Sequence, residues 1–146
     1  MRQPKHSIFD KESDLTNMEI SFPGGKKVKA SYHGFQILTD QPAVDGGSGS
    51  APAPFDLFLT SIGTCTGFYV LSFCQKNNIP TNNIRLLAQF KWNAEAHLVD
   101  HIRIEVHVPK DFPEKYRNAV IKAAGVCTVK RNLQHPPNVD IILALD

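Results

Sequence analysis

The sequence has few cysteines and none of the paired spacings that build metal or disulfide scaffolds. Its 146 residues include only three, Cys65, Cys74 and Cys127. A small secreted disulfide scaffold would carry more of them, in even number. The C-x-x-C spacing of a structural zinc site is also missing. We therefore expect a protein of the reducing cytoplasm that needs neither a metal nor a disulfide for stability.

Other familiar signatures are missing too. The glycine-rich stretch 40–54 lacks the Lys-Ser/Thr of a phosphate-binding loop, and no nucleophile-elbow motif indicates a Ser-His-Asp hydrolase. Basic residues are scattered, and the formal net charge of +2 points to no particular partner. We expect no nucleic-acid partner. The start of the chain mixes both signs of charge without the apolar core of a signal peptide. We expect a polar N-terminal tail over residues 1–17 and a single domain over residues 18–146.

The longest apolar stretch, residues 57–75, carries no charge at all. Its 19 residues approach the minimum for a membrane span, but six of them are Ser, Thr or Gln and two are glycine. An aromatic belt and a basic flank are lacking as well. A helix that is apolar around most of its circumference is typical of the centre of a soluble core. We predict such a helix from Pro54 to about Asn77, and no membrane association.

Alternating apolar and polar residues predict strands on both sides of this helix, and the fold class expected is α+β. A meander of three strands is expected before the helix, with turns at PGGK and at His33-Gly34. Between the meander and the helix, residues 40–54 are expected to form a flexible crossover. The further expected elements are strands at 84–92, 102–108 and 138–145, a helix over 109–124 and a short helix from about Cys127.

The three cysteines have different surroundings. Cys65 and Cys74 are nine positions apart, which puts them on opposite faces of the predicted helix. We expect Cys74 to be core packing, since free cysteine is among the most buried residue types. Cys127 is expected near the start of the short helix, with Lys130 and Arg131 within a turn, and both features lower the pKa of a thiol. Position alone leaves open whether Cys127 is functional or structural.

Two motifs carry a family resemblance. APAPFDLFLTSIGTC, residues 51–65, places a proline, an acidic residue and an apolar run before a cysteine, and AAGVCTVKRNL, residues 123–133, opens a short helix with another cysteine. Together they resemble the OsmC/Ohr family of osmotically inducible protein C and organic hydroperoxide resistance proteins, in its OsmC-like branch. The resemblance covers roughly residues 18–145. The matching positions are Pro54, Asp56, Leu57, Cys65, Cys127, Val129, Arg131 and Leu133.

The resemblance implies an OsmC-like fold, with antiparallel sheets packed on a long central helix, and an intertwined homodimer with its sites at the subunit interface. It also implies thiol-dependent reduction of hydroperoxides in oxidative-stress defence, without a cofactor. A Cys65 thiolate would attack the peroxide, Cys127 would resolve the sulfenic acid as a disulfide, and an external thiol or dithiol would reduce it. Asp56 and Arg131 would complete the site. An apolar pocket around Cys65 would favour organic peroxides, and its nearby apolar residues are Phe58, Ile62, Phe68 and Tyr69.

The chain departs from the family pattern in its charged residues. In the family's peroxidases an arginine from the N-terminal strands and a glutamate surround the attacking cysteine, but no arginine occurs here between Arg2 and Arg85. Arg131 or the lysines within 26–29 could supply charge, though a lysine lacks the bidentate geometry. Asp56 stands for the glutamate and is equally typical of a helix start. Two alternatives stay open: a non-catalytic module that binds an apolar small molecule at the dimer interface, and a structural or partner-binding dimer.

Overall fold

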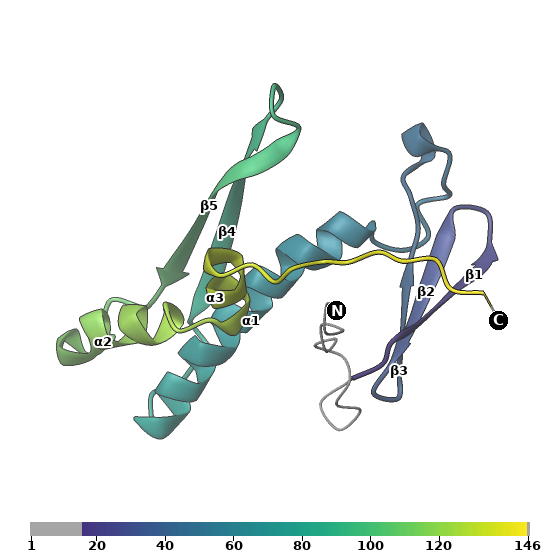
Figure 1. The fold of residues 1–146 in the computed structure, drawn as a ribbon. Helices are drawn as coiled ribbons and strands as arrows, with labels where there is room; N and C mark the ends of the chain where they lie inside the picture. The colour runs from purple at the N-terminus through teal and green to yellow at the C-terminus, as the bar shows by residue number, and fades with distance from the viewer. Residues whose placement is uncertain (1–15, 146) are drawn as a thin grey trace, which may run out of the picture. The chain divides into compact units, whose positions relative to one another are not determined.

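The computed structural model describes residues 16–145. The chain divides between Leu57 and Phe58 into two compact units, and each unit has its own antiparallel sheet (Figure 1). The expected α+β class, with two antiparallel sheets and one long helix, is confirmed. The expected tail, residues 1–17, lies outside the described residues except for its last two positions.

The first unit contains the expected meander of three strands. β1 (Glu19–Gly24), β2 (Lys27–Tyr32) and β3 (Phe35–Thr39) pair in the order β1-β2-β3, each antiparallel to its neighbour. Both turns use positive φ, at Gly24 and Gly25 and again at His33 with φ 48°. Glycine adopts such angles without steric cost, which explains how the PGGK turn reverses the chain so tightly.

The loop between β3 and the long helix is ordered around one buried carboxylate, which corrects the expectation of a flexible crossover. The Asp40 side chain accepts the backbone N–H of Gln41 at 2.8 Å. It also accepts the N–H and the hydroxyl of Ser48, at 3.2 and 2.6 Å, and those of Ser50, at 3.0 and 2.8 Å. These hydrogen bonds, Ser48 first, hold the pKa of Asp40 well below its ordinary range. A side chain at Gly47 would collide with the backbone carbonyl of Gln41.

The long helix α1 (Pro54–Lys76) has 23 residues, close to the expected bounds. A proline suits its first position, and helical geometry ends before Asn78, whose φ is 54°. By length and composition alone α1 could cross a membrane, a test that core helices of soluble proteins also pass. Its buried residues lie four apart and so form one stripe along the helix. They are Ile62, Thr66, Val70 and Cys74.

The second unit packs this stripe against a hairpin and two short helices, β4 (Arg85–Asn93), β5 (Leu98–His107), α2 (Glu114–Ala124) and α3 (Thr128–Gln134). Val70 and Cys74 of α1 meet Phe112 and Val120 in its core. Cys74 is completely buried, which confirms its expected packing role, and burial raises the pKa of this thiol.

The expected last strand does not form in the single chain. Residues 138–145 have no regular structure, and within the described residues they make no backbone hydrogen bond to any strand. A strand exists only through such bonds, so an alternating pattern alone cannot create one. The apolar side chains of this segment are 78% to 94% exposed. They are Val139, Ile141, Ile142, Leu143 and Leu145.

Candidate functional site

Cys127 is the residue that caps the start of α3, as its sequence position indicated. Its sulfur accepts the backbone N–H of Lys130 at 3.4 Å, and its carbonyl oxygen accepts the N–H of Arg131 at 3.0 Å. The side chain is only 1% exposed. The first turn of α3 therefore holds the Cys127 sulfur in one position, beneath the surface.

Hydrogen bonds favour the ionised form of this buried thiol. Burial raises the pKa of Cys127, but the Lys130 N–H, the side chains of Cys65 and Thr66 and the Val129 N–H lower it by more. The net pKa lies below the ordinary value for a thiol, as its position near a helix start indicated. The cause is hydrogen bonding from amides and side chains, rather than the charges of Lys130 and Arg131.

The structure brings the cysteines of the two motifs together. The side chain of the partly exposed Cys65 of α1 lies near enough to Cys127 to be among the groups that lower its pKa, although 62 positions separate them in the chain (127 minus 65). Both thiols are free. One turn further along α1, the hydroxyls of Tyr69 and Thr128 lie 2.9 Å apart and join α1 to the start of α3. Sequence reasoning missed this second link, because only the fold makes Tyr69 a neighbour of α3.

The charged residues named from the sequence are not bonded to either thiol. The Asp56 carboxylate accepts the backbone N–H of Ala53 at 3.0 Å, which is the behaviour of a helix-start residue. The exposed Arg131 guanidinium forms no ion pair or hydrogen bond with the described residues. The lysines within 26–29 belong to the first unit. The catalytic roles of Asp56 and Arg131 stay predictions.

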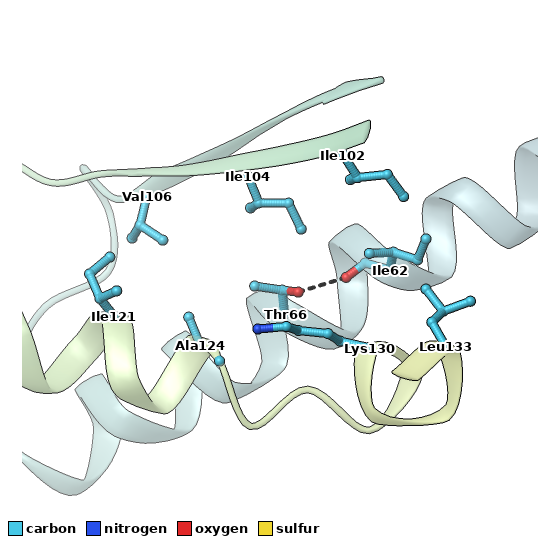
Figure 2. A pocket seen from close by; sticks show the side chains of 10 residues that line it. Ile62, Thr66, Ile102, Ile104, Val106, Ile121, Ala124, Lys130 and Leu133 are labelled. Carbon is cyan, nitrogen blue, oxygen red and sulfur yellow. Dashed lines mark hydrogen bonds between the residues drawn. The ribbon is translucent and has the colours of Figure 1, made fainter. Parts of the chain in front are cut away.

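An aliphatic cavity of about 320 Å³ lies between α1, β5, α2 and α3 (Figure 2). Thr66 and Lys130 line it, and both also interact with Cys127. The Thr66 hydroxyl donates to the carbonyl oxygen of Ile62 at 2.8 Å. Within the lining, Lys130 is the one charged residue, and Figure 2 shows its amino group directed toward Thr66. The other lining residues are Ile62, Ile102, Ile104, Val106, Ile121, Ala124, Gly125 and Leu133.

The expected pocket residues agree with this cavity only in part. Ile62 lines it, whereas Phe58, Phe68 and Tyr69 do not, and Phe68 is 60% exposed. Most of the wall comes from β5, α2 and α3. The alternating isoleucines of β5 predicted that one face of this strand is buried, but they could not predict which cavity that face lines. In the described part of the chain, no group of three or more His, Cys, Asp or Glu could hold a metal ion.

Comparison with known proteins identifies the family of the chain. Residues 47–142 match the model of the family described as OsmC-like protein. No curated protein matches the chain.

Several solved structures share the fold. The OsmC-like protein of Mycoplasma pneumoniae is 13% identical, with a TM-score of 0.65 over 84% of this chain and 89% of that one. A protein of Psychrobacter arcticus 273-4 named for the osmotic stress and detoxification response is 20% identical, with a TM-score of 0.68 over 81% and 88%. The organic hydroperoxide resistance protein OsmC of Legionella pneumophila is 15% identical, with a TM-score of 0.56 over 82% and 89%. At these identities the likeness shows the fold.

Proposed function

Because the chain belongs to the OsmC-like protein family, we propose that it is a thiol-dependent reductase of organic hydroperoxides. The observation that carries this proposal is the proximity of two free thiols from separate motifs, with the Cys65 side chain near enough to lower the pKa of Cys127. Two neighbouring thiols can take up an oxidising equivalent as a disulfide, which one buried cysteine cannot do. The same fold occurs in a Legionella protein named for organic hydroperoxide resistance.

The proposed reaction has two steps on the protein. The Cys65 thiolate attacks one oxygen of the peroxide, the O–O bond breaks, and the other oxygen leaves with a proton as the alcohol. Cys65 becomes a sulfenic acid. The Cys127 thiolate then attacks that sulfur, a disulfide forms, and the hydroxyl departs as water. An external thiol or dithiol reduces the disulfide by exchange.

The cavity supports an organic substrate. Its lining is aliphatic apart from Thr66 and Lys130, and those two residues also interact with Cys127. Burying an alkyl group there would gain about 0.8 kcal/mol per methylene, a gain that hydrogen peroxide cannot draw on. We therefore propose that the alkyl part of the peroxide occupies this cavity while its O–O bond faces the thiols.

We further propose that the protein works as a homodimer in the cytoplasm. Large apolar side chains stay exposed on the first sheet, with Phe22 at 81% and Phe35 at 71%, and Ile141 of the final segment is 94% exposed. Apolar surface of this extent is typical of a face covered by a partner. Two neighbouring free thiols also suit a reducing compartment.

The decisive experiment is mass spectrometry of the reduced protein treated with cumene hydroperoxide and quenched under denaturing conditions. The mass should fall by about two units on formation of one internal disulfide, and peptide mapping should join residues 65 and 127. Cys65→Ser should abolish peroxide consumption. Cys74→Ser, which alters the completely buried cysteine, is the matched control and should keep it. Unchanged mass without peroxide consumption would defeat the proposal.

A second candidate function is a non-catalytic module that binds an apolar small molecule. Two observations favour it: the aliphatic cavity and the lack of any arginine between Arg2 and Arg85. A native mass spectrum with a bound apolar ligand, together with thiols inert to peroxide, is its expected result. Rapid peroxide turnover with no retained ligand would rule it out.

A further inference from the structure

A second cavity, of about 270 Å³, lies entirely within the first unit. The turn between β1 and β2 forms one side of it, and the loop that Asp40 orders forms the other. We call it the turn–loop cavity, and its lining residues are Pro23, Gly24, Gly25, Lys26, Lys27, Asp40, Gly46, Gly47 and Ser48. Apart from one proline this lining is backbone, charged groups and a hydroxyl, so it suits a polar ligand, unlike the aliphatic cavity of the second unit.

Two ammonium groups belong to this lining. Within residues 16–145, neither the exposed Lys26 nor the half-buried Lys27 forms a side-chain hydrogen bond or an ion pair. The Lys26 side chain also reaches across to the loop, because a Cβ atom built at Gly46 would lie 3.5 Å from its Cε atom. Its charge is therefore held beside the cavity, where an anion can meet it.

The turn also offers unused backbone donors. In the described part of the chain, the N–H groups of Gly25 and Lys26 donate to no backbone or side-chain acceptor. The turn takes a positive φ at Gly24 (126°) and at Gly25 (60°). Successive N–H groups in such a turn form a concavity that favours an anion, and glycine leaves this backbone uncovered because it has no side chain.

The acidic residue of the lining is already satisfied by its own loop. Asp40 Oδ2 accepts the N–H and the hydroxyl of both Ser48 and Ser50, and Oδ1 accepts the N–H of Gln41. With two lysines and one carboxylate, the lining keeps a formal charge of +1 (2 minus 1). The turn–loop cavity is thus a polar, positively charged space whose lysines are not used by the carboxylate.

We propose that the turn–loop cavity binds the phosphate group of a small phosphate monoester. Lys26 and Lys27 contact the phosphate oxygens as point charges, and the Gly25 and Lys26 N–H groups donate to the same oxygens. A phosphate monoester carries a charge of about −1.5 to −2 at pH 7, so its attraction to two ammonium groups outweighs its repulsion by one hydrogen-bonded carboxylate.

The volume favours a monoester over the free ion. A water molecule occupies roughly 30 Å³ in the liquid, so the turn–loop cavity holds about nine groups of that size. A phosphate ion alone leaves part of this space unfilled, whereas a short hydroxylated group attached to it fills the remainder and meets polar walls. This site is remote in sequence from both cysteine motifs, and it does not rest on the proposed reductase activity.

The test is isothermal titration calorimetry of the full chain at low salt, with glycerol 3-phosphate, inorganic phosphate and glycerol as probes. Glycerol 3-phosphate should bind, inorganic phosphate should bind more weakly and glycerol should not bind, and added salt should lower the affinity. Lys26→Gln and Lys27→Gln should each weaken binding roughly tenfold, because each removes a charged partner of the phosphate. Lys29→Gln removes the same charge from β2 outside the lining, so this matched control should bind almost as the parent does.

A second measurement locates the bound phosphate. Titration with glycerol 3-phosphate should move the amide signals of Gly25, Lys26 and residues 46–48 in ¹H–¹⁵N spectra. Lys26→Arg keeps the charge and should retain most of the affinity, which separates loss of charge from loss of the side chain that lies along Gly46. Far-UV circular dichroism and thermal unfolding verify that every variant folds.

Three results would overturn the site. They are no binding of glycerol 3-phosphate, an equal loss of affinity in the Lys26, Lys27 and Lys29 variants, and amide shifts confined to other parts of the chain. Inorganic phosphate that binds as tightly as the monoester would overturn the assignment of the organic part. Peroxide consumption is a separate measurement, so failure of this site leaves the reductase proposal standing, and the reverse also holds.

Discussion

The size of the cavity predicts how the reaction should depend on the length of the substrate. A series of primary alkyl hydroperoxides changes the apolar tail while leaving the O–O bond almost the same. The cavity has a volume of about 320 Å³, and a water molecule takes roughly 30 Å³ in the liquid, so the cavity matches about ten groups of that size. We expect kcat/KM to rise with chain length and to level off at roughly eight to ten carbons.

The slope of that rise follows from the hydrophobic effect. Each buried methylene contributes about 0.8 kcal/mol, and about 1.4 kcal/mol corresponds to a factor of ten, so each added carbon should raise kcat/KM about fourfold. The binding energy of the tail is realised in both ground and transition states, so it should appear mainly in KM.

A variant of the cavity wall makes this prediction specific. Ala124→Leu adds three carbons inside the cavity and should shorten the rising part of the series by about three carbons. Ala123→Leu, at the adjacent position of α2 outside the lining, is the matched control. The assay is peroxide consumption at steady state with excess dithiol, and thermal unfolding checks that both variants fold. A flat series, or a series that both variants shift equally, would refute the assignment of the cavity to the alkyl group.

Three further predictions concern stability. Val70→Ala, at a site 2% exposed, should lower the free energy of unfolding by about 2 to 3 kcal/mol in urea titrations, whereas Val44→Ala, 91% exposed, should change it little; equal losses would contradict the assigned core. The folded-state pKa of Cys127 is lowered, so ionisation of this thiol stabilises the folded protein above the unfolded pKa, and this stabilisation is lost as pH falls. Under reducing conditions, the difference in unfolding free energy between the parent and Cys127→Ser should therefore widen from about pH 7 to pH 9. A difference that does not depend on pH would contradict this. Asp40 likewise stabilises above its ordinary pKa of 3.8 and loses that effect as pH falls further, so Asp40→Asn should open the loop to limited proteolysis at neutral pH, and its stability deficit should shrink in acid; an unchanged cleavage rate would argue against this role.

Local patterns in the sequence were enough to predict most of the elements. The uncharged run predicts α1, because an apolar circumference and a proline start are properties of that segment alone. Strict alternation predicts β5, and the odd cysteine count with two separate motifs indicates where thiol chemistry belongs. These signals depend on neighbours within a few residues, so no tertiary information is needed to read them.

The features that sequence reasoning missed all depend on contacts between distant residues. Asp40 orders its loop by accepting hydrogen bonds from serines 8 and 10 positions away. The sequence of a glycine-rich loop does not indicate which carboxylate will accept such bonds. The Tyr69–Thr128 bond spans 59 positions. The cavity takes its wall from four separate elements. Each of these features forms only when the chain folds, because tertiary packing, and not spacing along the sequence, determines which residues meet.

The final segment, residues 138–145, has the sequence pattern of a strand but no strand partner among the described residues. Val139, Ile141, Leu143 and Leu145 alternate along residues 138–145 as they would in a strand, yet all of them are at least 78% exposed. Exposed branched apolar side chains are unfavourable in water, and the unpaired backbone of this segment is free to pair with a sheet edge, so the pattern fits a strand that binds one. A homodimer would supply that edge from its second copy. Truncation after Pro137 should therefore shift the oligomeric state seen by analytical ultracentrifugation toward monomer, and a dimer of unchanged affinity would mean that this segment is not part of the interface.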